Sequence, residues 1–184
     1  MKYDLLDNLQ LDNEGMAKAI AREIDSIIAQ GGTDSSRLAQ EAAQNPTDAS
    51  TWFDLGVALI ADADMLDYLM AQKYLMENPG TEIDENTVYA DASLKESIYE
   101  KSLKCFAKVL ELEPDYYGVH YQRGTVFANL RNYAEAEKSF LLALEDDPED
   151  FSAAHDLAMV YQDMGDEERC NKYLDMAERL AAEE

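Results

Sequence analysis

The chain has 184 residues, and its 39 acidic against 15 basic residues give a formal net charge of −24 at pH 7. This charge argues against nucleic acid as a partner, because phosphates would be repelled rather than exchanged for counterions. A hydrophobic fraction of 47% is enough for the core of one domain or one short array. The two cysteines, Cys105 and Cys170, lie in helical patterns rather than in a disulfide framework, which indicates a reducing compartment.

No run approaches the 18 or so apolar residues of a membrane span, and the first residues, MKYDLLDNLQLDNEG, hold no apolar core of signal-peptide length. We therefore expect a soluble cytoplasmic protein with no membrane partner.

Two helices are predicted before the first proline. The stretch MAKAIAREIDSIIAQGG shows helical periodicity and ends at Gly31 and Gly32. A shorter helix should begin at Thr33 or Asp34, as its cap, and continue to the turn at Pro46.

The positions of the helix-breaking residues in 49–113 favour one long helical hairpin. The only cluster of helix-breaking residues between Pro46 and Pro114 is Asn78-Pro79-Gly80-Thr81. Helices over about residues 49–77 and 85–113, with their connection near Pro79, would satisfy this pattern. The alternative, two degenerate repeats that meet at Pro79, stays open.

Residues 117–148 predict an ordinary helical hairpin, with a turn at residues 130–133 and a stop at Pro148. Gly124 and Ala136 are small enough to let the two backbones approach closely, and Phe127 and Phe140 would fill the remaining space.

These residues resemble the tetratricopeptide repeat (TPR) family, whose period is about 34 residues. The family's landmark positions hold Gly124, Phe127, Tyr133, Ala136, Phe140, Ala143 and Pro148. The first-helix signature also occurs in TWFDLG, which ends at Gly56, and the second-helix signature in the segment that holds Tyr99, Phe106 and Pro114. Gly56 and Pro114 are 58 positions apart, against about 24 in an ordinary repeat, so about one period has been inserted.

A further repeat is predicted from residue 149 on, with its turn at Gly165 and Asp166. Cys170 stands at the small-residue position that Ala136 holds one repeat earlier, so we expect it to be a packing residue rather than a reactive thiol.

The resemblance implies an all-α fold, a right-handed superhelical solenoid of antiparallel helical hairpins with one elongated hairpin. We divide the chain into an N-terminal leader with capping helices (1–46), the divergent elongated hairpin or two degenerate repeats (47–114), a repeat (115–148), and a repeat with the C-terminal end (149–184).

In the family, the first helices of the hairpins line a concave groove for a peptide or a partner helix. By resemblance, the groove residues here would be Phe53, Tyr121, Gln122, Thr125, Asn129, His155, Asp156, Met159 and Gln162. Some members hold acidic C-terminal tails with a clamp of Lys, Asn and Arg. The corresponding positions here hold Phe53, Val57, Val88, Gly118 and Gln122, none of them cationic, so we expect no binding of such tails.

No residue set points to catalysis, a cofactor or a metal. His120 and His155 lie about one repeat apart rather than in one local cluster, and no phosphate-binding, serine hydrolase or zinc protease motif occurs. The leading hypothesis is a non-catalytic adaptor or co-chaperone whose partner is an apolar protein segment with basic residues. The alternative is a scaffold that self-associates, for instance as a homodimer, through the long hairpin or an uncapped C-terminal helix.

Overall fold

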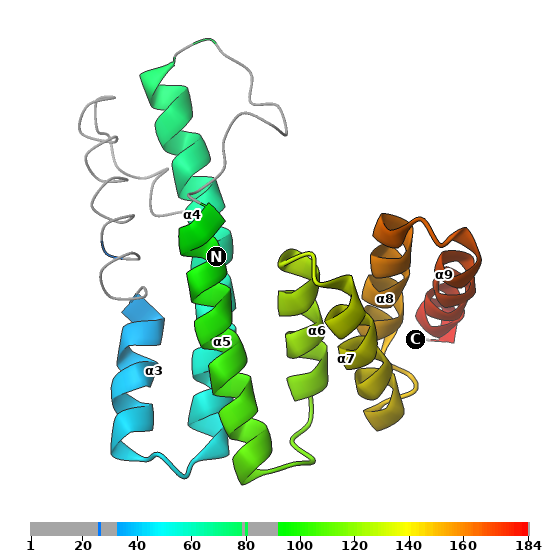
Figure 1. Cartoon of the computed structure of the whole chain (residues 1–184), viewed down its shortest axis with the longest axis horizontal. Coiled ribbons are helices and arrows are strands. Elements are labelled where there is room, and N and C mark those ends of the chain that lie inside the picture. The colour runs from blue at the N-terminus through cyan, green and yellow to red at the C-terminus, as the bar shows by residue number, and fades with distance from the viewer. Residues whose placement is uncertain (1–25, 27–32, 79, 81–91, 184) are drawn as a thin grey trace.

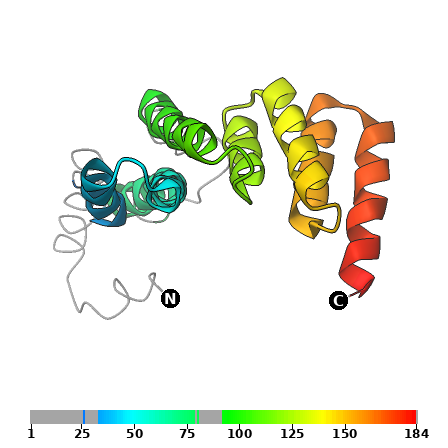
Figure 2. The same ribbon diagram turned by 90° about the horizontal axis from the view of Figure 1, so that it is seen from below.

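The computed structural model describes residue 26 and residues 33–78, 80 and 92–183. Its helices are α3 (Thr33–Gln44), α4 (Ala49–Glu77), α5 (Ala92–Leu112), α6 (Val119–Asn129), α7 (Tyr133–Asp146), α8 (Phe151–Met164) and α9 (Glu167–Glu183). Figure 2 shows them following one another across the molecule in chain order, and each packs against the next. The predicted all-α solenoid of antiparallel hairpins with one elongated member is confirmed. The helix predicted before Gly31 lies outside the described residues apart from Ser26.

The elongated hairpin consists of α4, with 29 residues, and α5, with 21 residues. The two lie side by side in Figure 1, and α4 extends well past the shorter helices α6 to α9. α4 has the predicted bounds and runs without a break through Ala63, and α5 runs without a break through Lys95. Asp48 caps the start of α4 by accepting hydrogen bonds from the backbone of Ser50 and the hydroxyl of Thr51. The predicted connection at Pro79 and the start of the second helix near Glu85 fall outside the described residues.

A glycine facing a phenylalanine sets the spacing within this hairpin. A Cβ atom at Gly56 would lie 2.5 Å from Cε1 of Phe106, which is closer than atoms can pack. Beside this contact, the buried hydroxyl of Ser102 donates a 2.8 Å hydrogen bond to the carbonyl oxygen of Gly56. The absence of a side chain at residue 56 is therefore what lets α4 and α5 approach.

The hairpin α6/α7 uses the same device, since a Cβ atom at Gly124 would lie 2.6 Å from the ring of Phe140. Its turn is tight. Arg131 adopts a left-handed backbone with φ 56°, and the backbone N–H groups of residues 131 and 132 bond back to carbonyls of α6.

The predicted short helix before Pro46 is α3, and it packs on α4. Leu38 and Ala42 are buried in the core that α4 and α5 share. The Ser35 hydroxyl donates a 2.6 Å hydrogen bond to the Asp62 carboxylate of α4.

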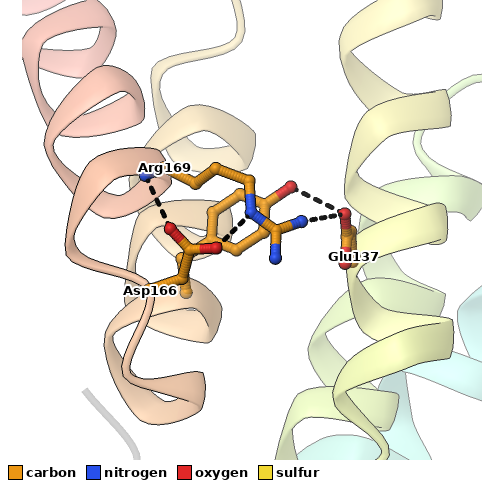
Figure 3. A network of polar contacts seen from close by, with 4 residues as sticks. Glu137, Asp166 and Arg169 are labelled. Carbon is orange, nitrogen blue, oxygen red and sulfur yellow. Dashed lines mark hydrogen bonds and ion pairs between the residues drawn. The ribbon is translucent and has the colours of Figure 1, made fainter.

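A polar network joins three helices at the far end of the solenoid (Figure 3). The Arg169 guanidinium of α9 donates at 2.8 Å to Glu137 of α7 and at 2.6 Å to Asp166. It also lies over the Tyr161 ring of α8, 4.3 Å from the ring centroid, and the Tyr161 hydroxyl donates to the same Glu137 oxygen at 2.9 Å. The network therefore fixes how the hairpin α8/α9 sits against α7.

Both cysteines are free and buried. Burial raises the pKa of the Cys105 thiol to about 11. Cys170 packs in the cluster that contains Ala136 and Phe140, which agrees with the predicted packing role. Of the helices described, none is both long enough and apolar enough to cross a membrane.

Candidate partner-binding site

The nine predicted groove residues come from three helices, and we call the side that they were predicted to line the groove face. Phe53 lies on α4, residues 121, 122, 125 and 129 lie on α6, and residues 155, 156, 159 and 162 lie on α8. α4 contacts α6, and α6 contacts α8, so these first helices of successive hairpins lie next to one another.

Tyr121 and Asp156 connect α6 to α8 on this face. The Tyr121 hydroxyl donates a 2.9 Å hydrogen bond to Oδ2 of Asp156. Burial of the ring and, next, the charge of Asp156 raise the pKa of Tyr121 to about 12, so the hydroxyl keeps its proton at neutral pH. The other carboxylate oxygen of Asp156 lies 3.2 Å from Nδ1 of His155, and the His155 ring stacks on Phe151.

The other predicted residues differ in how free they are to meet a partner. Asn129 and Gln162 are exposed. Met159 is half-buried against the cluster of α7, α8 and α9 side chains. The hydroxyl of Thr125 donates to the Tyr121 carbonyl of its own helix at 3.2 Å.

A hollow with a volume of about 690 Å³, open to solvent, lies beside this face. It lies where the α5–α6 and α7–α8 connections meet α4 and α6, and we refer to it as the α6 hollow. Its lining residues are Phe53, Glu113, Asp115, Tyr116, Tyr117, Gly118, Tyr121, Gln122, Asp150 and Ser152. Three of the nine predicted residues, Phe53, Tyr121 and Gln122, therefore line the hollow, and the other six do not.

The aromatic wall of the α6 hollow continues into the core. The Phe53 ring lies 5.2 Å from the Tyr116 ring and 5.9 Å from the Phe106 ring, centroid to centroid. Gly118, just before α6, has a left-handed φ of 81°, and a Cβ atom there would lie 3.6 Å from Phe53. A glycine thus gives the chain its turn into α6 and leaves the hollow open.

The connection residues of this hollow are absent from the sequence prediction. Glu113, Asp115, Tyr116 and Tyr117 precede α6, and they look like an ordinary solvated turn in sequence. The signal in the sequence that could have found Tyr117 is a large aromatic side chain in a turn. In the structure this side chain is 67% exposed.

The two histidines do not form a common site. His155 is tied to Asp156 and Phe151, whereas Nδ1 of His120 is buried with no hydrogen-bond partner in the part of the chain that the structure describes. Among those residues, no three potential metal ligands come together.

A second hollow, of about 840 Å³, lies along one face of α9. All its lining residues belong to that single helix: Glu168, Asn171, Lys172, Asp175, Glu178, Arg179 and Ala182. It is therefore a polar, open helix surface rather than a site between helices.

The comparison with known proteins identifies the central hairpin. The tetratricopeptide repeat family model matches residues 117–150, which span α6, α7 and the connection to α8. Residues 117–150 are similar to one tetratricopeptide repeat. The resemblance inferred from Gly124, Ala136 and Phe140 is confirmed by this match.

No curated protein matches the sequence. Among solved structures, one described as MamA is 15% identical and covers 95% of this chain and 98% of its own, with a TM-score of 0.46. One described as MamA 41-end from Desulfovibrio magneticus RS-1 is 13% identical and covers 96% and 99%, with a TM-score of 0.45. One described as MamA MSR-1 C2 is 20% identical and covers 91% and 97%, with a TM-score of 0.45. Likenesses at this level indicate nothing about what this chain binds.

Proposed function

We propose that this chain is a non-catalytic protein-interaction module, an adaptor or co-chaperone that binds a peptide or a partner helix across α4, α6 and α8. The observation that carries the proposal is the α6 hollow, an aromatic-walled recess of about 690 Å³ beside the repeat that the family matches. Exposed apolar side chains that gather into one patch typically mark an interaction surface, whereas single scattered ones do not. Tyr117, 67% exposed, lines the hollow, and Phe151, 41% exposed, lies between the lining residues Asp150 and Ser152.

The partner we propose is an apolar protein segment with basic residues. A net charge of −24 raises the encounter rate with cationic segments, although physiological salt shortens the reach of this attraction to about 8 Å. Charge alone gives little specificity, so contacts with half-buried side chains must carry the affinity. Tyr121 and Met159 are the anchors we propose, because both are half-buried, each offers a large side chain, and the family resemblance puts both on the groove face.

Co-purification from the native cell, followed by affinity measurement with the recovered partner, tests the proposal. Tyr121→Ala and Met159→Ala should each weaken binding by about 1 to 2 kcal/mol, and binding should weaken as salt rises. Met164→Ala is the matched control, because this methionine is also on α8 but is 42% exposed and away from the predicted groove positions. Unchanged affinity in both groove variants would show that this face is not the binding surface.

Acidic C-terminal tails should not bind. Three positions that would carry the clamp in other family members, Phe53, Gly118 and Gln122, line the α6 hollow together with three carboxylates. A carboxylate needs charge-assisted donors to offset its desolvation, and these side chains offer one neutral amide. Titration calorimetry with a Glu-Glu-Val-Asp peptide should therefore show no heat of binding, and micromolar affinity would contradict the proposed register.

Self-association through the long hairpin is a second candidate, favoured by the 39% exposure of Tyr68 on the projecting part of α4. The C-terminal helix supports it less, because the outward face of α9 is polar and Leu180 is half-buried. A light-scattering mass measured over a range of concentrations tests this candidate. A monomer at every concentration would exclude self-association as the function.

A further inference from the structure

The charged residues that line the α6 hollow are all acidic. Its lining contains four aromatic side chains and three carboxylates, Glu113, Asp115 and Asp150, but no Lys or Arg. Asp147, which accepts a 3.2 Å hydrogen bond from the lining residue Tyr117, adds a fourth carboxylate at the rim.

These carboxylates are not neutralised by the protein. In the described part of the chain, Glu113, Asp115 and Asp150 form no ion pair. Arg123 is the basic residue nearest in sequence on α6, and its guanidinium lies over the Phe127 ring instead, 5.7 Å from the centroid.

Two helix N-termini near the hollow would by themselves attract an anion, since each carries roughly half a positive charge. The start of α8 is already satisfied, because Oδ1 of Asp150 accepts a 3.0 Å hydrogen bond from the Ala153 N–H. The start of α6, at Gly118, has no side-chain cap. One partial charge of this size is outweighed by three full carboxylates, so the hollow favours a cation.

The same molecule already holds a cation in this way elsewhere. Arg169 lies over the Tyr161 ring, 4.3 Å from its centroid, with its guanidinium bonded to the carboxylates of Glu137 and Asp166 (Figure 3). The α6 hollow offers the same combination of aromatic faces and carboxylates, with the cation missing from the lining. A planar guanidinium suits such a site better than an ammonium, because it stacks on rings and bonds carboxylates in a fork.

We infer that the α6 hollow receives an arginine side chain of the partner segment, which stacks against the aromatic wall made by Phe53, Tyr116 and Tyr121 and pairs with Glu113 and Asp115. This inference rests on the proposed function, to which it adds the chemistry of one subsite. It places the basic residue of the partner between α4 and α6, beside the α5–α6 connection.

The test is a nuclear magnetic resonance titration of the whole chain with the peptide acetyl-Leu-Arg-Leu-amide. Its control contains citrulline, which has the shape of arginine without the charge. The backbone amides of Gly118, Gln122 and Ser152 should shift with the arginine peptide, and the citrulline peptide should bind at least about tenfold more weakly. The double variant Glu113→Gln/Asp115→Asn should weaken arginine-peptide binding about tenfold.

The matched control is Asp175→Asn/Glu178→Gln, which changes the net charge equally but on α9, at the C-terminal end of the row of helices (Figure 2). It should change arginine-peptide affinity less than about twofold, since distant surface charges are screened.

Equal binding of the citrulline peptide, shifts confined to other residues, no shift up to the solubility of the peptide, or stronger shifts with acetyl-Leu-Glu-Leu-amide would each overturn the arginine subsite. The proposed function is judged separately, by the effect of Tyr121→Ala and Met159→Ala on the co-purified partner. If the arginine subsite is disproved but these two variants still weaken binding of the partner, the proposed interaction function holds without the subsite.

Discussion

The hairpins α4/α5 and α6/α7 share one contact but differ in length. Gly56 faces Phe106 at 2.5 Å in the first, and Gly124 faces Phe140 at 2.6 Å in the second, measured to a Cβ atom placed on each glycine. The contacting residues are 50 positions apart in the long hairpin and 16 apart in the short one. The difference, 34, equals the repeat period of about 34 residues.

This difference teaches that the contact, not the connection, defines the hairpin. The additional residues lie between Gly56 and Phe106, where α4 and α5 both extend further past the Gly–Phe contact than α6 and α7 do. On the other side of the contact, the spacing from each phenylalanine to the next proline is the same, Phe106 to Pro114 and Phe140 to Pro148. Closing a loop of 50 rather than 16 residues costs only about 1 kcal/mol more in chain entropy. The insertion is therefore tolerated as long as the glycine and the phenylalanine still meet.

The largest expected effect comes from removing the phenylalanine. Phe106→Ala and Phe140→Ala should each lower the free energy of unfolding by about 3 to 5 kcal/mol, because both rings are almost completely buried. Denaturant unfolding followed by circular dichroism measures both. If the two contacts are equivalent, the two losses agree within about 1 kcal/mol.

The control for these variants is Phe151→Ala, whose ring is 41% exposed. Its loss should stay below about 1 kcal/mol. A much smaller loss for Phe106→Ala than for Phe140→Ala would break the comparison, since the long hairpin would then depend on packing elsewhere along α4.

Much of this comparison was visible in the sequence. Gly56 and Phe106 stand at recognisable landmark positions, and helical periodicity with one breaker cluster predicted the bounds of α4. Both signals are local, because side-chain spacing along a helix and turn-forming residues act within a few positions.

The α6 hollow could not be predicted in the same way. It is assembled from α4, the α5–α6 connection, α6 and the start of α8, and no local pattern says which turns come together. Glu113, Asp115 and Asp150 look like ordinary solvated charges until the fold places them beside Phe53. Tyr121, Gln122 and Phe53 were found because they lie on first helices, whose shared face the family resemblance implies.

A smaller effect is expected from filling the glycine positions. Gly56→Ala and Gly124→Ala each place a methyl group within 2.6 Å of a phenylalanine ring. Overpacking of this kind costs about 1 to 3 kcal/mol, and alanine returns up to about 1 kcal/mol through its higher helix propensity. Thermal or denaturant unfolding should therefore show a net loss in both variants.

A double-mutant cycle gives the check. Gly124→Ala combined with Phe140→Leu should destabilise by less than the sum of the two single variants, since the smaller side chain makes room for the methyl group. Strict additivity would show that the glycine is needed for a reason other than the ring.

The two hairpins also differ at the small-residue position four residues before the contacting phenylalanine. Ser102 occupies it in α5 and Ala136 in α7, and only Ser102 bonds the glycine carbonyl that it faces, at 2.8 Å. Ser102→Ala should therefore cost about 1 kcal/mol. If Ala136 stands to Gly124 as Ser102 stands to Gly56, Ala136→Ser should cost less than the roughly 1 to 3 kcal/mol of Ala136→Val, because the hydroxyl is small and would bond the Gly124 carbonyl. Equal losses for Ala136→Ser and Ala136→Val would show that the two positions are not equivalent.

The smallest effect concerns the polar contact between one hairpin and the next. Arg169 makes this contact for the hairpin α8/α9, and the long hairpin has no arginine at the matching position. Arg169 directly precedes Cys170, and the matching residue before Ser102 is Lys101, which is exposed. The pKa of Asp166 is lowered, first by the hydrogen bond from the backbone N–H of Arg169 and then by that from its guanidinium. A carboxylate with a lowered pKa stabilises the fold above its unfolded pKa of about 3.8, and this stabilisation is lost as pH falls through the folded pKa, which lies below 3.8.

The variant Asp166→Asn can still accept the hydrogen bond from the Arg169 backbone N–H at the start of α9, but it cannot ionise. Its loss of stability relative to the wild type should therefore be present at pH 6 and should shrink on acidification below about pH 4. Thermal unfolding across this range measures it, with Asp163→Asn, an exposed carboxylate on α8, as the control. A difference between Asp166→Asn and the wild type that stays constant down to about pH 2 would mean that the charge of Asp166 contributes nothing to the link.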